Sequence, residues 1–178
     1  MAEPDTAALA RRIWDKAYLT GEFTLRSGQV SNDYFDKYRF EADPSLLRDI
    51  CEVMAPMVPP GIDALAGLEM GGIPVVTVLS QLTGLPAVFV RKTAKVYGTC
   101  QFAEGLDVEG KHLLVIEDVV TSGGQVVIST GMLRDAGATI TSALCVIDRE
   151  AGGREALGAA GIKLDAVLTR TELESAVA

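Results

Sequence analysis

The most constraining feature of the sequence is an apolar run, Leu113 to Ile116, that leads directly into two acids and a loop of small residues. A short, continuously apolar segment is typical of a strand in the middle of a parallel sheet, where both faces are covered. Glu117 and Asp118 therefore fall at the carboxyl end of that strand, where open α/β sheets bind their ligands. The residues from Val119 to Gly124 are expected to turn into a helix that begins near Gln125.

The composition of this loop suits an anion. Small residues let backbone N–H groups close around a phosphate, and the helix N-terminus adds a favourable dipole. Acids beside such a cradle are expected if the same ligand also carries a ribose diol or a Mg²⁺. An ordinary strand–turn–helix unit with surface acids is the alternative. The P-loop and dinucleotide-binding glycine motifs are absent.

Strands and helices alternate along most of the chain, which predicts an α/β fold with a mainly parallel sheet, right-handed crossovers and helices on both faces. The segment up to about residue 42 lies outside this alternation and is expected to form a small N-terminal hood within a single domain of residues 1–178. Expected helices cover 6–18, with Thr6 as N-cap, 43–58, 73–82 and 125–135. Expected strands cover 63–67, 87–91, 112–119, 142–148 and 164–168. For residues 169–178 the sequence leaves two alternatives, a helix or a frayed end.

Composition excludes several classes of function. A net charge of −8 argues against a general binder of nucleic acids or membrane surfaces. No apolar run is long enough to span a membrane, and the N-terminus lacks the features of a signal peptide. The three cysteines are scattered along the chain, which predicts that the protein works in a reducing cytoplasm and argues against a zinc site. Cys51 and Cys145 are expected in the core.

A basic cluster, Arg91, Lys92 and Lys95, stands out against this acidic background. It opens a segment, 91–105, that leaves one strand and does not reach the next until His112. Loops of this length in compact domains are usually lids or binding segments. The cluster is either a solvated face or a clamp for a multiply charged ligand, and the acidic strand end makes the clamp the better interpretation.

The strand end and its loop resemble the 5-phosphoribosyl 1-diphosphate (PRPP) binding motif of type I phosphoribosyltransferases, in which an apolar strand, two acids and two apolar residues precede Thr-Ser/Ala-Gly. Four further segments, in the family's order, resemble orotate phosphoribosyltransferases. They are the signature-like stretch 23–36, the glycine-rich turn 67–74, the basic loop 91–105, and the Asp-Arg strand end within 146–153.

The resemblance implies a type I phosphoribosyltransferase fold and Mg²⁺-dependent transfer of a phosphoribosyl group from PRPP to orotate, in pyrimidine biosynthesis. It implies that Lys95 is the principal catalytic cation, with Glu117 and Asp118 holding ribose hydroxyls or metal-bound water. Mg²⁺ would be held through PRPP. The implied PRPP-binding residues are Arg26, Gly71, Gly72, Arg91, Lys92, Lys95, Tyr97, Glu117, Asp118, Val119, Val120, Thr121, Ser122, Gly123, Gly124 and Gln125.

For orotate, the resemblance implies that Arg149 grips the carboxylate, that Thr121 donates to the same ligand, and that Tyr34 and Phe35 flank the pyrimidine. It also implies a cytoplasmic homodimer in which the 91–105 loop covers the neighbouring site. The chain departs from the family at Arg26, where lysine is usual, and at Tyr97, where histidine is frequent. It also lacks the lysine that many relatives have in the 67–74 turn.

Two alternatives remain open. The first is a phosphoribosyltransferase for a purine or another base, which Arg149 and the basic loop argue against. The second is a non-catalytic regulator that keeps the fold to bind nucleotides or RNA. The acidic charge and the presence of Lys95 argue against that second class.

Overall fold

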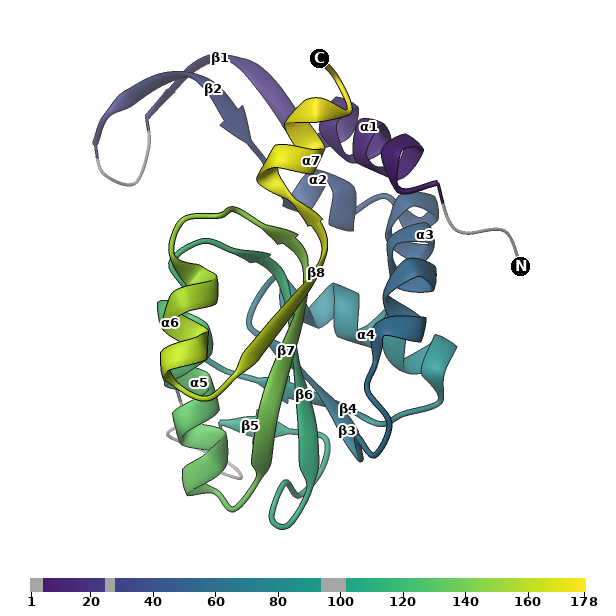
Figure 1. The fold of residues 1–178 in the computed structure, drawn as a ribbon, viewed down its shortest axis with the longest axis vertical. Helices are drawn as coiled ribbons and strands as arrows, with labels where there is room; N and C mark the ends of the chain where they lie inside the picture. Colours follow the sequence, from purple (N-terminus) through teal and green to yellow (C-terminus); the bar gives the residue numbers. More distant parts are fainter. Residues whose placement is uncertain (1–4, 25–27, 94–101) are drawn as a thin grey trace.

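A computed structural model describes residues 5–24, 28–93 and 102–178. Its centre is a six-stranded sheet in the order β5-β4-β3-β6-β7-β8 (Figure 1). All neighbouring pairs are parallel except β4 and β5, which are antiparallel. The strands are β3 (Ala64–Leu68), β4 (Ala87–Val90), β5 (Ala103–Glu104), β6 (His112–Val120), β7 (Thr139–Asp148) and β8 (Lys163–Thr169).

Helices cover both faces of this sheet, as Figure 1 shows. α3 (Pro44–Met54) and α4 (Gly72–Thr83) pack on one face, and their apolar residues share a buried cluster with those of α1 (Thr6–Ala17). α5 (Gly124–Asp135) and α6 (Gly153–Ala159) pack on the other face, over a second buried cluster. The continuous burial of β3 and β6 follows from this arrangement, because a strand covered on both faces has no solvent side.

Local sequence signals explain where the helices begin. Asp43 accepts hydrogen bonds from the N–H groups of Ser45 and Leu46, and Pro44 occupies the first helical position of α3. At α1 the capping residue is Asp5, which accepts from the Ala8 N–H, so the expectation of Thr6 as N-cap was wrong by one position. Aspartate caps well because its short side chain reaches the free N–H groups of the first turn.

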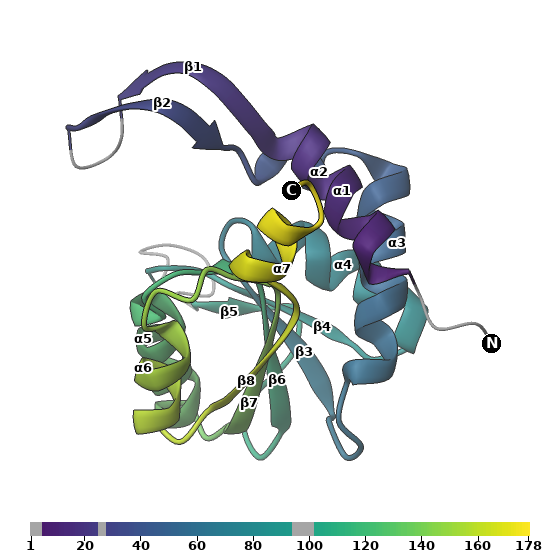
Figure 2. The same cartoon turned by 45° about the horizontal axis from the view of Figure 1, so that its top comes forward.

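The first part of the chain forms the hood. β1 (Tyr18–Thr24) and β2 (Val30–Phe35) pair as an antiparallel hairpin, and residues 36–37 connect it to the short helix α2 (Tyr38–Glu41). The hairpin extends away from the sheet, and α7 (Arg170–Ser175) lies between it and the carboxyl ends of the strands (Figure 2). The hood and the C-terminal helix therefore stand over the sheet edge where ligands of α/β folds bind.

Most expected elements are confirmed, including the α/β class and the parallel sheet. Cys51 and Cys145 are buried, as expected. The segment between Arg91 and His112 was expected to hold no strand, but β5 occurs there and extends the sheet at its edge. The hairpin and α6 were not expected, and residues 170–175 are helical. Within the part of the chain that the structure describes, no helix is long and apolar enough to cross a membrane.

Candidate active site

Two acids occupy the carboxyl-terminal half of β6. The strand continues to Val120, so Glu117 and Asp118 lie inside it and not just after it. The carboxylate of Asp118 is fully buried, and Glu117 is buried as well. Burying two adjacent carboxyl groups is costly unless each has a partner or a proton, and their surroundings supply both.

The partner is Lys37, from the hood. Its ammonium group lies 2.6 Å from Oδ2 of Asp118; the lysine side chain as a whole is one-third exposed, whereas the Asp118 side chain has no exposure. Gly71 contacts the same carboxylate from the turn after β3, where a β-carbon would overlap with it. The acid on β6 is thus held between a hood lysine and a glycine of the β3–α4 turn.

A third carboxyl group, Glu41 of α2, is buried beside this pair. Burial, reinforced by the hydrogen bond and negative charge of Asp118, raises the pKa of Glu41 to about 9. Burial and the charge of Asp118 also raise the pKa of Glu117. The raised pKa keeps a proton on Glu41 at neutral pH, and Glu41 can donate it to Asp118.

Asp118 keeps the negative charge. Burial alone would raise its pKa, but hydrogen bonds from Glu41 and Lys37 outweigh burial and lower it. For Lys37, burial alone would lower the pKa, and the hydrogen bond and charge of Asp118 raise it above its ordinary value. The cluster therefore contains a carboxylate on Asp118, an ammonium on Lys37 and a protonated Glu41.

The loop after β6 borders this cluster. Gly123 has φ +74°, a left-handed conformation that favours glycine, and a β-carbon there would also overlap with Leu157. Its carbonyl accepts the hydrogen bond from Val127 that starts α5. A cavity of about 320 Å³ lies over the loop. Its lining includes the predicted loop residues Val119, Val120, Thr121, Ser122, Gly123, Gly124 and Gln125, together with Glu117, Gly71, Lys37 and Lys92.

Not every loop side chain is available to a ligand. Thr121 and Ser122 are exposed, while the side chain of Val120 is buried in the core and leaves only its backbone for contact. Gly72 packs against the carbonyl of Ile116, so it serves the close approach of α4 to β6. Thr121 was expected at both the phosphate and the orotate sites, and the structure places it on the cavity over the loop.

The predicted cations of the basic segment do not all lie at the cavity over the loop. The backbone N–H of Lys92 donates to Oε2 of Glu69 (3.0 Å), which fixes the start of the basic segment at the cavity. Arg91 pairs with Glu104 of β5 (3.4 Å) and lines a neighbouring hollow instead. The peptide bond between Glu69 and Met70 is cis. The predicted residues Arg26, Lys95 and Tyr97 lie outside the described residues.

A second cavity, of about 360 Å³, opens between the hood, the end of β7 and α7. Arg149 lines it together with Tyr34 and Phe35, so three of the four predicted orotate-binding residues share one hollow, and Thr121 lies at the other cavity. The guanidinium carbon of Arg149 lies 5.9 Å from the centre of the Phe35 ring. Tyr34 packs against Phe23 of the hairpin and is 44% exposed. An aromatic wall beside a cation suits a flat, anionic ligand.

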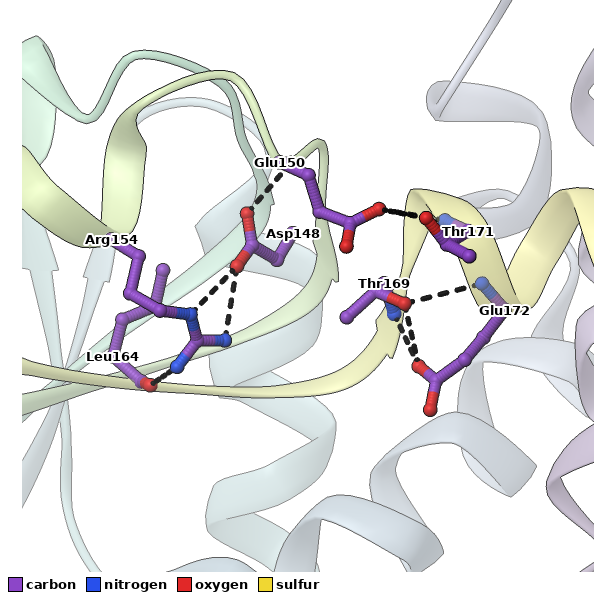
Figure 3. A network of polar contacts seen from close by, with 7 residues as sticks. All are labelled: Asp148, Glu150, Arg154, Leu164, Thr169, Thr171 and Glu172. Carbon is purple, nitrogen blue, oxygen red and sulfur yellow. Dashed lines mark hydrogen bonds and ion pairs between the residues drawn. The ribbon is translucent and has the colours of Figure 1, made fainter.

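Arg149 is half-buried and is not engaged by the acids next to it in the sequence. Figure 3 shows where those acids point: Asp148 binds the guanidinium of Arg154 (3.0 Å), and Glu150 accepts from the N–H and hydroxyl groups of Thr171. Burial and the nearby charge of Arg170 lower the pKa of Arg149. Arg170 is paired with Glu174 (2.6 Å), which lines the same cavity, so Arg149 is the guanidinium that this cavity offers to an anion.

Sequence reasoning missed Lys37, Glu41 and Arg170. Lys37 and Glu41 follow the predicted hood signature but match none of its positions. Only the folding of α2 against β6 brings them to Asp118. Arg170 begins a helix that the sequence left open. Arg170 comes close to Arg149 only when the chain folds, so the spacing of the two residues in the sequence does not indicate their interaction.

The described residues contain no group of three or more histidine, cysteine or acidic side chains arranged to hold a metal ion. Asp118 already has an ammonium partner, so it suits indirect contact with a cation through water better than direct ligation. The donor set therefore fits a Mg²⁺ that a ligand brings with it, and Glu117 or Asp118 would receive its bound water.

This geometry has counterparts in known proteins. Residues 55–159 match the family model described as "Phosphoribosyl transferase domain". An orotate phosphoribosyltransferase from a Nocardioides strain is 51% identical over 96% of this chain and 95% of its own length. One from Methanocella arvoryzae is 42% identical over 86% of this chain and 87% of its own length. The PRPP complex of the Mycobacterium tuberculosis orotate phosphoribosyltransferase has 28% identity and a TM-score of 0.82, covering 96% of this chain and 99% of that one.

The domain match defines the class: this is a phosphoribosyltransferase fold, and the matched residues include the loop of small residues between β6 and α5. The identity to curated relatives over nearly the whole chain then narrows the class. The chain belongs to the orotate phosphoribosyltransferase family.

Proposed function

We propose that this protein transfers the 5-phosphoribosyl group of PRPP to orotate, giving orotidine 5′-monophosphate and diphosphate in pyrimidine biosynthesis. The observation that carries the proposal is the pairing of two adjacent cavities at the carboxyl ends of β6 and β7. One lies over a phosphate loop with buried acids, and the other combines Arg149 with aromatic rings. The relatives named above have this activity in their names.

The loop cavity would hold PRPP. The backbone of residues 121–125 cradles the 5′-phosphate, since the loop leads into the N-terminus of α5. Glu117 and Asp118 hold the ribose hydroxyls or metal-bound water, and Gly71 lets the backbone approach the ligand. Mg²⁺, which arrives with PRPP, supplies positive charge to the diphosphate. The complex of the Mycobacterium tuberculosis relative with PRPP supports this class of substrate.

The second cavity would hold orotate. A guanidinium binds a carboxylate through two parallel hydrogen bonds, which favours orotate over uracil, a base without that carboxylate. Phe35 and Tyr34 provide apolar surface for the pyrimidine. When the bond at the ribose C1 breaks, negative charge moves to the diphosphate. Lys92 and Lys95 would stabilise it, so that catalysis rests on positioning and fixed charge.

The protein would act in the cytoplasm as a homodimer, with the whole chain forming one domain and the 91–105 loop covering the partner's site. Arg91 and Tyr97 would join the diphosphate contacts when that loop closes, and Arg26 would reach PRPP from the hairpin. Loop closure would exclude water from the reacting atoms.

Isolation of the product tests the proposal. Incubation with orotate, PRPP and Mg²⁺ should yield orotidine 5′-monophosphate and diphosphate in equal amounts, and omission of any of the three should yield neither. A regulator would instead retain RNA on a column in a salt-dependent manner and form no product. An acidic protein that is an enzyme should pass through such a column.

A further inference from the structure

The cavity over the phosphate loop offers few cations to a multiply charged ligand. Among the described residues that line it, Lys37 and Lys92 are the two with cationic side chains. The whole chain carries a net charge of −8, so local cations must supply the attraction. Lys92 belongs to the basic segment, whereas Lys37 comes from the hood, where the family resemblance places Arg26 but not Lys37 among the PRPP-binding residues.

We infer that Lys37 is a PRPP-binding residue that the hood contributes, holding Asp118 in the free protein and contacting an anionic oxygen of PRPP when the ligand is bound. This inference rests on the proposed function and adds a residue to its PRPP site. It also gives α2 a role in binding the sugar phosphate.

The position of Lys37 supports the inference. Its ammonium group pairs with a fully buried carboxylate, while the lysine side chain as a whole is one-third exposed and lines the same cavity as Thr121 and Gly71. An ammonium has three donors, so one bond to Asp118 leaves donors for a ligand. A lysine that served only to neutralise Asp118 would not need to line the cavity over the loop.

The surroundings also keep Lys37 charged and in place. The contact with Asp118 raises the pKa of Lys37, and the absence of a side chain at Gly71 leaves room for the carboxylate at this position. A positive charge held in position before binding loses less entropy than a mobile surface lysine does. Lys37 is therefore prepared for an anion in the free protein.

Calorimetric titration with PRPP and Mg²⁺ tests the inference. Lys37→Met should weaken PRPP binding by roughly tenfold or more, the usual loss for one charged hydrogen bond. Lys37→Arg should recover most of it. Lys163→Met is the matched control, because Lys163 is also paired with an aspartate (2.9 Å) but is exposed and begins β8, at the end of the strand opposite the cavity. Equal affinity for wild type and Lys37→Met would overturn the inference. Failure of the wild type to bind PRPP would instead overturn the proposed function.

A double-mutant cycle separates direct contact from an effect through Asp118. If Lys37 contacts PRPP, Lys37→Met should weaken binding further in an Asp118→Asn background. If it acts only by orienting Asp118, the second change should have no additional effect, and the inference is wrong.

Chemical labelling of the wild-type protein avoids variants that fail to fold. Reductive methylation of Lys37, followed by mass spectrometry, should slow at least several-fold with saturating PRPP and Mg²⁺ and should not slow with orotate alone. Labelling of Lys163 should stay constant. Unchanged labelling of Lys37 at saturating PRPP would contradict the inference.

Discussion

The α-carbon of Gly71 lies against the carboxylate of Asp118, so closely that a β-carbon at position 71 would overlap with Oδ2. This contact joins the turn after β3 to the acid on β6, and the same acid is bound by Lys37 of the hood. Three separate parts of the chain therefore fix one carboxylate. The geometry of the PRPP cavity depends on all of them.

Gly71→Ala should damage this arrangement, since either the turn or the buried acid must move. We expect destabilisation of about 1–3 kcal/mol, the usual cost of overpacking, and a larger loss of PRPP binding. Thermal unfolding and calorimetry measure the two effects. Gly131→Ala is the control: a β-carbon there meets nothing, and alanine within α5 should be neutral or slightly stabilising. Wild-type PRPP affinity in Gly71→Ala would contradict the contact.

Glu41→Gln should change how stability depends on pH. Glu41 has a raised pKa in the folded protein, so it keeps a proton that the unfolded chain loses above its ordinary pKa of 4.5. Stability should therefore fall as the pH rises from about 4.5 to about 9, by at most ~1.4 kcal/mol per pH unit from this group. Glutamine cannot ionise, so the variant should lose this part of the decline.

Urea unfolding at pH 6 and pH 8.5 measures the difference. The exposed residue Glu155 provides a control, and Glu155→Gln should follow the wild type. If Glu41→Gln is less stable than the wild type at pH 8.5 and declines as steeply, Glu41 is not the protonated partner of Asp118.

Arg149→Ala should abolish measurable orotate binding while PRPP binding is retained, because the guanidinium is the cation beside the aromatic wall. Arg149→Lys should restore charge without the two-point geometry and should recover only part of the affinity. Calorimetry with each substrate separates the two sites. Collapse of PRPP affinity with normal orotate binding would reverse the assignment of the cavities.

Glu150→Ala should raise the KM for orotate several-fold with little change in the KM for PRPP. Glu150 binds both the N–H (2.8 Å) and the hydroxyl (2.6 Å) of Thr171 and so attaches the start of α7, which lines the Arg149 cavity. Thr171→Val removes the hydroxyl contact alone and should have a smaller effect in the same direction. Steady-state kinetics with each substrate varied would detect it, and equal effects on both KM values would argue for a general loss of structure.

Lys95→Ala should reduce turnover roughly 100-fold or more, the scale of removing one group that stabilises charge in a transition state, with a modest change in orotate affinity. Lys163→Ala is the control lysine, exposed and distant. Single-turnover kinetics would show the loss in the chemical step. Unchanged turnover would remove Lys95 from the catalytic role.

The sequence predicted the sheet and its phosphate loop because their signals are local. The apolar run before Glu117 can only be a covered strand, and Asp43-Pro44 begins a helix in any context. The hairpin was missed because its strands are mostly exposed and lack the apolar alternation of a half-buried strand. β5 has two residues, too few for any periodic signal.

The lining of the loop cavity was predictable where a motif carried it and unpredictable where tertiary contact did. Thr121 to Gln125, which the loop sequence singled out, line that cavity, and their binding roles stay a prediction. The role of Lys37 depends on the packing of α2 against β6. Lys37 and Asp118 are separated by about half the length of the chain, and the residues next to Lys37 in the sequence do not indicate the contact. The protonation of Glu41 has the same origin, because burial beside Asp118 exists only after folding.

The most direct test of the whole account is the loss of orotate absorbance after purified protein is added to PRPP and Mg²⁺, with uracil, adenine and hypoxanthine in parallel. The account predicts that orotate alone is consumed, since the Arg149 cavity selects its carboxylate. Consumption of another base in its place would contradict the assigned substrate. No reaction with any of the four, while PRPP still binds, would contradict the catalytic function.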